Sequence, residues 1–258
     1  VRRLLRTARD MTFPFNVYGP ALAGAAIATA LSLPWWRRRC TRWALVDDPG
    51  HRKIHHRPVP LAGGLAVLTG LLVPLAAGAV LLLSNVLGGS GTLEPYAADL
   101  FAYGFSRRFV PLLVLLAGAL GMAVLGLLDD RHDLRPAAKF AGQTLIALAV
   151  ALAGIRITLF VESGWFSVAV TVLWIVTLTN ACNFLDNMNG LCAGLGTIGC
   201  WSFGWSAALQ GQFLVAAIGF LTCGALLGFL PFNFPKATTF LGDAGSHLVG
   251  YLLAVLAI

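Results

Sequence analysis

The residues of this chain that could do chemistry form short groups of Asp, Asn, Lys and Gly that interrupt long apolar runs. Asp129 and Asp130 stand side by side at the end of one such run, and Lys139 follows shortly after them. Two adjacent carboxylates do not both ionise comfortably without a cation nearby. Carboxylates that converge with basic residues suit Mg²⁺ and a phosphorylated ligand, because hard oxygen atoms hold the ion while Lys and Arg hold phosphate. Solvated loop charges are the alternative interpretation.

A polar stripe leads into a third acid. Asn180, Asn183 and Asp186 follow one another at intervals of three, so they share a face of any helix that continues that far. Polar groups at membrane depth need partners, which a nucleotide or an ion would supply, or which another helix would supply by hydrogen bonding. Farther along, the pattern Gly-Asp-x-Gly-Ser around Asp243 predicts a carboxylate beside exposed backbone amides at a helix start.

A basic cluster occupies the segment from Lys53 to Arg57, directly after an Asp-Pro-Gly turn signal. Such a cluster is suited to a diphosphate group. Within it, His55 and His56 are adjacent, and neighbouring residues on a regular helix or strand cannot both face one ion. A phosphate-binding or surface role is therefore favoured for this pair over a metal site.

The elements that must position these groups are apolar helices. Of 258 residues 58% are hydrophobic and only 11% charged, and the mean hydropathy is +0.80. A soluble domain is roughly a quarter charged, so a soluble enzyme is disfavoured. A helix needs about 20 apolar residues to cross a bilayer. The sequence predicts an all-α polytopic membrane protein with eight transmembrane segments, over residues 15–36, 59–83, 109–128, 137–155, 168–185, 191–209, 213–232 and 245–258.

The distribution of charge then indicates on which side of the membrane each loop between these segments lies. The odd-numbered loops, counted together with Lys139 at the start of the fourth segment, hold 11 basic residues, against 7 in the even-numbered loops and the amino-terminal stretch. The positive-inside rule puts the odd-numbered loops in the cytoplasm. Seven of the eleven acids also lie in those loops. We therefore expect an integral protein of the inner (plasma) membrane whose acid-bearing site faces the cytoplasm.

Together these groups resemble the polyprenyl-phosphate N-acetylhexosamine-1-phosphate transferases, glycosyltransferase family 4. The resemblance is carried by four stretches in register: Asp47 to Gly64, Leu127 to Asp130 with Lys139-Phe140 and Gln143, Asn180 to Leu191, and Phe240 to Ser246. It implies a bundle of ten or eleven membrane helices. Eight of them would be present here, in a single integral membrane transferase domain over residues 1–258 that is truncated at its C-terminus, before the family's His-rich cytoplasmic loop.

The resemblance also implies an activity. Members move a sugar-1-phosphate from a UDP-sugar to undecaprenyl phosphate or a related lipid, release UMP and need Mg²⁺, with Mn²⁺ as an alternative. This reaction starts lipid-linked cell-envelope glycan synthesis. The partners are then a UDP-sugar, a polyprenyl phosphate and the membrane, without nucleic acid, and a homodimer stays open. The pattern Asp47 to His55 is more similar to the N-acetylglucosamine branch than to the phospho-N-acetylmuramoyl-pentapeptide branch, which remains an alternative.

Matching the family motifs assigns roles residue by residue. One departure stands out, because Asn189 occupies a position where the family usually has Asp, which bears on uracil or sugar recognition and on the charge at the metal. The assignments that follow from the resemblance are Asp186 and Asp243 for the metal, Asp129 and Asp130 as the catalytic acidic pair, Phe240 stacked on uracil, Asn183 and Asn189 near the nucleoside, and Lys139, Lys53, His55, His56 and Arg57 at the phosphates.

Two other classes of function compete with this interpretation. A non-catalytic transporter would explain the hydropathy, but its key charges would more often lie at the middle of a span than on one face. A relative that binds lipid without turnover is the second. Release of UMP that depends on both lipid phosphate and Mg²⁺ separates these classes.

Overall fold

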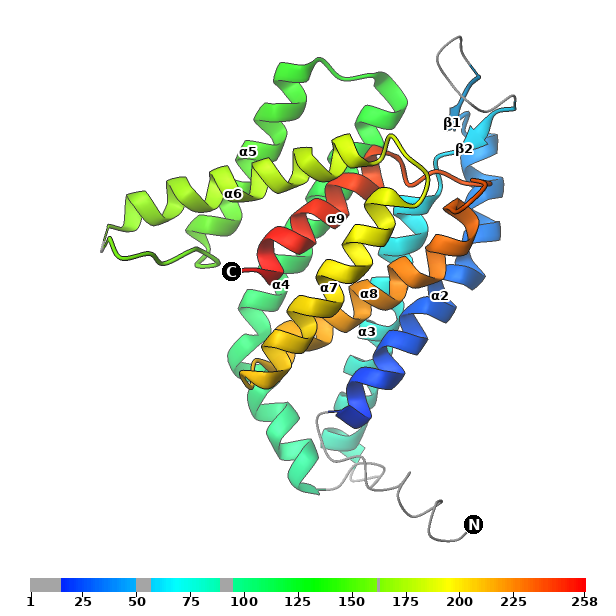
Figure 1. Ribbon diagram of the computed structural model, residues 1–258. Helices are drawn as coiled ribbons and strands as arrows, with labels where there is room; N and C mark the ends of the chain where they lie inside the picture. Colours follow the sequence, from blue (N-terminus) through cyan, green and yellow to red (C-terminus); the bar gives the residue numbers. More distant parts are fainter. Residues whose placement is uncertain (1–14, 50–56, 89–94, 162) are drawn as a thin grey trace, which may run out of the picture.

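The computed structural model describes residues 15–49, 57–88, 95–161 and 163–258 and is almost entirely helical (Figure 1). Each of the eight apolar segments falls mainly on a helix, although residues 59–62 of the second segment precede its helix and include a short strand. The elements are α2 (Phe15–Arg42), β1 (Val46–Asp47), β2 (Val59–Pro60), α3 (Gly63–Gly88), α4 (Pro95–His132), α5 (Pro136–Leu152), α6 (Gly164–Leu185), α7 (Leu191–Leu209), α8 (Phe213–Asn233) and α9 (Gly242–Leu256).

The helices bear out an all-α polytopic membrane protein, but not the full number of spans. Within the described residues, five stretches are long and apolar enough to cross a bilayer, and α5 is apolar but shorter. The count of eight spans therefore stays a prediction. The five stretches are Asn16–Arg42, Gly63–Leu81, Arg108–His132, Gly164–Leu185 and Phe213–Asn233.

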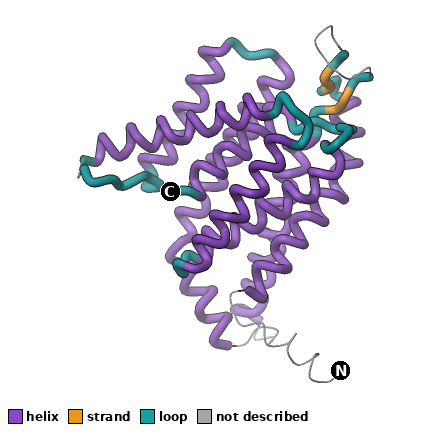
Figure 2. Tube along the Cα trace, in the orientation of Figure 1, coloured by secondary structure: helices purple, strands orange, loops and turns teal. Residues whose placement is uncertain are grey.

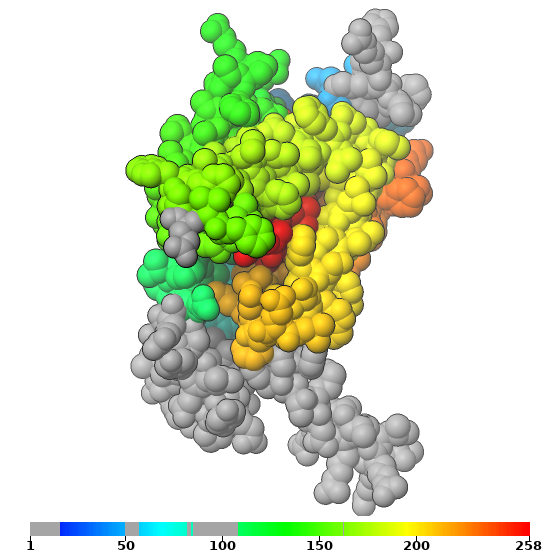
Figure 3. Space-filling view, turned by 60° about the vertical axis from the view of Figure 1, so that its left-hand side comes forward, coloured from blue at the N-terminus to red at the C-terminus, as the bar shows by residue number. Residues whose placement is uncertain are grey.

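Helices α8 and α9 form the centre of the bundle. Helix α8 packs against α2, α3 and α7, whereas α9 packs against α3, α4 and α6. Nearly every side chain of α9 is buried. In Figure 3 its red atoms reach the surface of that face only in a narrow strip between α6 and α7.

Glycines let the central helices approach to backbone contact. A Cβ atom on Gly224 or Gly228 would collide with the backbone of Leu22 or Ala26 on α2. A Cβ atom on Gly126 of α4 would likewise collide with the carbonyl group of Asp243 at the start of α9. Small residues at such positions allow van der Waals packing between helices in a membrane. The contact at Gly126 brings the end of α4, with its two acids, against the N-terminus of α9.

The loops that carry the polar groups gather at one end of the bundle. Figure 2 shows the loops α6–α7 and α8–α9 beside the two strands at that end. The strands pair antiparallel, with Val46 opposite Pro60 and Asp47 opposite Val59. The α8–α9 loop continues this pairing, because the N–H group of Phe240 donates to the carbonyl of Pro60 at 3.1 Å and its carbonyl accepts from Gly63 at 2.9 Å.

Candidate active site

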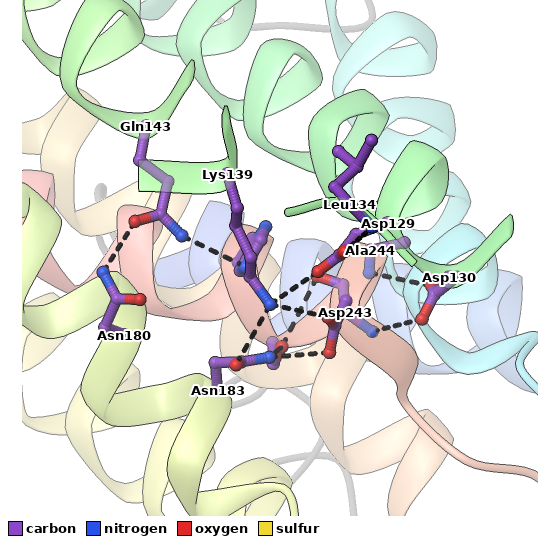
Figure 4. A network of polar contacts seen from close by, with 11 residues as sticks. Asp129, Asp130, Leu134, Lys139, Gln143, Asn180, Asn183, Asp243 and Ala244 are labelled. Atoms are coloured by element: carbon purple, nitrogen blue, oxygen red, sulfur yellow. Dashed lines mark hydrogen bonds and ion pairs between the residues drawn. The ribbon is translucent and has the colours of Figure 1, made fainter. Parts of the chain in front are cut away.

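A lysine from α5 joins acids from two other helices (Figure 4). The Nζ atom of Lys139 lies 2.6 Å from Asp129 Oδ2 and 2.7 Å from Asp243 Oδ2. Asn183 at the end of α6 completes the group, because its Nδ2 donates to Asp243 Oδ1 at 2.7 Å and its Oδ1 accepts from Lys139 at 3.3 Å. We call Asp129, Lys139, Asn183 and Asp243 the lysine cluster. It unites residues from α4, α5, α6 and α9.

The adjacent acids Asp129 and Asp130 have different environments. Both oxygens of Asp130 accept backbone N–H groups at the start of α9, from Asp243 at 2.8 Å and from Ala244 at 3.0 Å. The first N–H groups of a helix have no partner within it, and Leu241 before α9 supplies no side-chain cap. Asp130 therefore caps α9 from another helix, whereas Asp129 is buried and bonds Lys139 and the N–H group of Leu134.

Asp186 lies directly after α6 and accepts a hydrogen bond from the backbone of Gly242. Burial of its carboxyl raises the pKa to about 8, and the nearby carboxylates of Asp243 and Asp130 act in the same direction. The fold therefore holds the carboxylates of Asp130, Asp186 and Asp243 close together, and the protein compensates only part of their negative charge.

The donor atoms present fit a divalent cation. Among the described residues, Asp129, Asp243 and His247 each offer a ligand atom, and these atoms lie within 4.8 Å of one another. Carboxylate oxygens are the ligands that Mg²⁺ prefers. Asp186 is not part of this group. Sequence reasoning missed His247, which looked like one residue of an apolar run, although its spacing of four from Asp243 puts both on one face of α9.

Of the remaining expected site residues, the structure describes Phe240, Asn189 and Arg57. Phe240 is half-buried in the α8–α9 loop, and exposed Asn189 donates to the carbonyl of Pro235 at 3.3 Å. Arg57 is exposed, whereas Lys53, His55 and His56 lie outside the described residues.

Asn233 at the end of α8 ties two site loops together and was not anticipated. Its buried side chain accepts from the N–H group of Gly190 at 2.6 Å and donates to the carbonyl of Thr239 at 3.1 Å. Gly190 has a φ of 75°, a conformation that favours glycine. The Asn-Gly-Leu stretch that follows Asp186 is thereby fixed against the loop that carries Phe240.

An apolar groove of about 860 Å³ runs between α5 and α6. One end lies beside the lysine cluster, since Phe140 and Phe184 line it and are the chain neighbours of Lys139 and Asn183. Leu148, Val172 and Val176 continue the apolar lining. A charged head group at the cluster and an apolar tail in the groove could therefore be held at once.

A sequence model of glycosyl transferase family 4 matches residues 112–258, which include all four residues of the lysine cluster.

The chain belongs to glycosyl transferase family 4.

Curated relatives of this family-4 protein extend the similarity to nearly the whole chain. A probable undecaprenyl-phosphate N-acetylglucosaminyl 1-phosphate transferase of Bacillus subtilis is 30% identical over 87% of this chain and 58% of its own length. A decaprenyl-phosphate N-acetylglucosaminephosphotransferase of Mycolicibacterium smegmatis is 36% identical over 90% of this chain and 58% of its own length. A phospho-N-acetylmuramoyl-pentapeptide-transferase of Halalkalibacterium halodurans is 30% identical over 90% and 70%. The chain thus spans 58% of the first two relatives.

Proposed function

We propose that this family-4 protein transfers N-acetylglucosamine-1-phosphate from a UDP-sugar to a polyprenyl phosphate such as undecaprenyl phosphate, and releases UMP. The observation that carries the proposal is the lysine cluster at the end of the apolar groove. A polyprenyl phosphate has the matching form, with a dianionic head group and a long apolar tail. The names of the B. subtilis and M. smegmatis relatives support N-acetylglucosamine as the sugar.

The reaction is a phosphoryl transfer, in which positioning and electrostatic stabilisation do most of the work. An oxygen of the lipid phosphate attacks the phosphorus atom that carries the sugar. The bond from that phosphorus to the bridging oxygen breaks, and UMP leaves with the bridging oxygen. Lys139 stabilises the charge that develops on the phosphoryl oxygens. Asp129 orients the attacking phosphate or accepts its proton.

In this proposal Asp129 and Asp130, the expected catalytic pair, divide their roles. Asp129 belongs to the lysine cluster and bonds Lys139, so it is the acid that acts on substrate. Asp130 has both oxygens bonded to α9, so it positions Asp243. Asp243 and Asp129 would hold Mg²⁺, or Mn²⁺ in its place, with Asp186 beside them. The ion, when bound, neutralises diphosphate charge and makes UMP a better leaving group.

The nucleoside would lie toward the α8–α9 loop, with Phe240 stacked on uracil and Asn183 and Asn189 nearby. The basic segment Lys53 to Arg57 would contact phosphates. We place the site at the cytoplasmic face of the plasma membrane, in agreement with the excess of basic residues in the odd-numbered loops.

The test uses the protein in lipid nanodiscs and measures UMP release. We expect release only when UDP-N-acetylglucosamine, polyprenyl phosphate and Mg²⁺ are all present. Lys139→Met should abolish release, and Lys236→Met, which alters an exposed lysine of the α8–α9 loop, is the matched control.

Release from UDP-N-acetylmuramoyl-pentapeptide alone would move the protein to the branch of the H. halodurans relative. Absence of release from either donor by folded protein would favour a transporter or a non-catalytic lipid-binding relative.

A further inference from the structure

A second polar group lies beneath the lysine cluster, deeper in the bundle. Gln143 follows Lys139 by one turn of α5, and His247 follows Asp243 by one turn of α9. Both side chains are fully buried, and Gln143 Nε2 lies 3.2 Å from His247 Nε2. A nitrogen of His247 also lies within 4.8 Å of ligand oxygens of Asp129 and Asp243.

Hydrogen bonds made by Asn180 of α6 determine which end of the Gln143 amide faces His247. The Nδ2 atom of Asn180 donates to the carbonyl of Val176 at 2.8 Å, and a backbone carbonyl can only accept. The same Nδ2 donates to Gln143 Oε1 at 2.6 Å (Figure 4). Gln143 must therefore present its NH₂ group to His247. Because an NH₂ group only donates, His247 Nε2 accepts and the neutral ring carries its proton on Nδ1.

In this state neither nitrogen of the His247 ring has a lone pair available for a metal ion. A metal ligand needs a free lone pair, but the lone pair of Nε2 accepts from Gln143 and Nδ1 is protonated. Among the described residues, Nδ1 of His247 is buried and has no hydrogen-bond partner. A buried polar atom without a partner is costly, so the arrangement needs a reason other than packing.

We infer that Gln143 and Asn180 determine metal specificity by keeping His247 out of the coordination shell. Carboxylate oxygens alone then hold the cation, which suits Mg²⁺ and Mn²⁺, whereas an added imidazole nitrogen suits Zn²⁺. The inference rests on the proposed function only in requiring that Asp129 and Asp243 hold a divalent cation. It assigns a role to three residues of α5, α6 and α9 that do not touch the sugar nucleotide in our proposal.

Two substitutions at Gln143 should each leave a nitrogen of the His247 ring free to bind a cation. Gln143→Glu keeps the size and the acceptor for Asn180, but its second oxygen accepts from Nε2–H, which moves the proton and frees the lone pair of Nδ1. Gln143→Leu removes the donor, so that either nitrogen can bind a cation. Protein in nanodiscs is loaded with Mn²⁺ alone and examined by pulsed electron paramagnetic resonance, which detects a nitrogen atom bonded directly to the ion.

We expect bound Mn²⁺ without coupling to an imidazole nitrogen in the wild type, and with it in at least one Gln143 variant. The coupling should disappear when His247→Leu is added. In the variant that shows coupling, affinity for Zn²⁺ relative to Mg²⁺ should rise on the order of 10–100-fold. His247→Leu alone should leave the Mn²⁺ affinity within about twofold of the wild type.

Coupling to imidazole in the wild type would overturn the inference, as would its absence from both folded Gln143 variants that bind Mn²⁺. A loss of Mn²⁺ affinity of more than about tenfold in His247→Leu would do so as well. These outcomes leave the proposed function intact. If the wild type binds no Mn²⁺ at all, the metal site itself is wrong, and the proposed function falls with it.

Discussion

Replacing Lys139 by Met tests how much the positive charge in the lysine cluster contributes to stability, because the shape of the side chain changes little. Met keeps most of the apolar stem but removes the ammonium group that two carboxylates share. The side chains of Lys139, Asp129 and Asp243 are 18%, 8% and 32% exposed, so water compensates little of this loss. Breaking a buried ion pair costs about 3–5 kcal/mol. Because Asp243 is the most exposed of the three, we expect about 3 kcal/mol.

For a chain of this size, 1 kcal/mol corresponds to about 2–4 °C of melting temperature. Lys139→Met should therefore melt about 6–12 °C lower than the wild type. Unfolding can be followed with a thiol-reactive fluorophore, because the five cysteines Cys40, Cys182, Cys192, Cys200 and Cys223 are all free and buried. Saturating Mg²⁺ should restore part of the loss, since a divalent cation neutralises the same two carboxylates. Lys236→Met serves as control and should melt with the wild type.

A melting temperature of Lys139→Met within about 2 °C of the wild type, without Mg²⁺, would refute this reasoning. The ion pairs would then contribute nothing that solvent does not supply. Equal destabilisation by Lys236→Met would also refute it, because the effect would follow from net charge rather than from the cluster.

Three further predictions concern residues around the cluster. Asp130→Ala should lower stability by about 0.5–2 kcal/mol through loss of the cap on α9, and Asp130→Asn by less. Asp129→Asn should abolish turnover and also lower the melting temperature, because it removes the charge of one partner of the buried ion pair with Lys139. Without divalent metal, stability should fall as pH rises from about 4 to about 8, because Asp186 ionises at lower pH in the unfolded chain than in the fold, where burial raises its pKa to about 8. Asp186→Asn should flatten that slope in melting curves measured between pH 5 and 9. An unchanged slope would show that Asp186 is not its source. Gly126→Ala should destabilise the protein, because its Cβ collides with the backbone of Asp243, whereas Gly78→Ala meets open space and should melt with the wild type.

Hydropathy was enough to predict where the helices lie, since each apolar segment became a helix. It did not predict their ends. The first segment was expected to stop at residue 36, yet α2 continues to Arg42, because its last turns carry arginines that can reach water while the backbone stays helical. Helix α4 likewise begins at Pro95, well before the apolar run expected from residue 109.

The candidate site, too, could be predicted from the sequence only in part. Spacing could indicate that Asp129, Lys139, Asn183 and Asp243 open onto one face, because each lies at or near the end of an apolar run. It could not separate Asp129 from Asp130, since the difference arises from the approach of α4 to α9 at Gly126. His247 was missed for a related reason, as its partner Gln143 lies 104 residues away on another helix.

The most direct test of the proposed reaction follows one phosphorus atom. UDP-N-acetylglucosamine labelled with ³²P at the phosphate next to the sugar is incubated with the protein, polyprenyl phosphate and Mg²⁺. Transfer of sugar-1-phosphate predicts that the label moves into the lipid fraction in equal amount to the UMP released, and that Asp129→Asn abolishes both. Label that stays in UDP, or that appears as free sugar-1-phosphate in water, would contradict the transfer of sugar-1-phosphate to lipid at the lysine cluster.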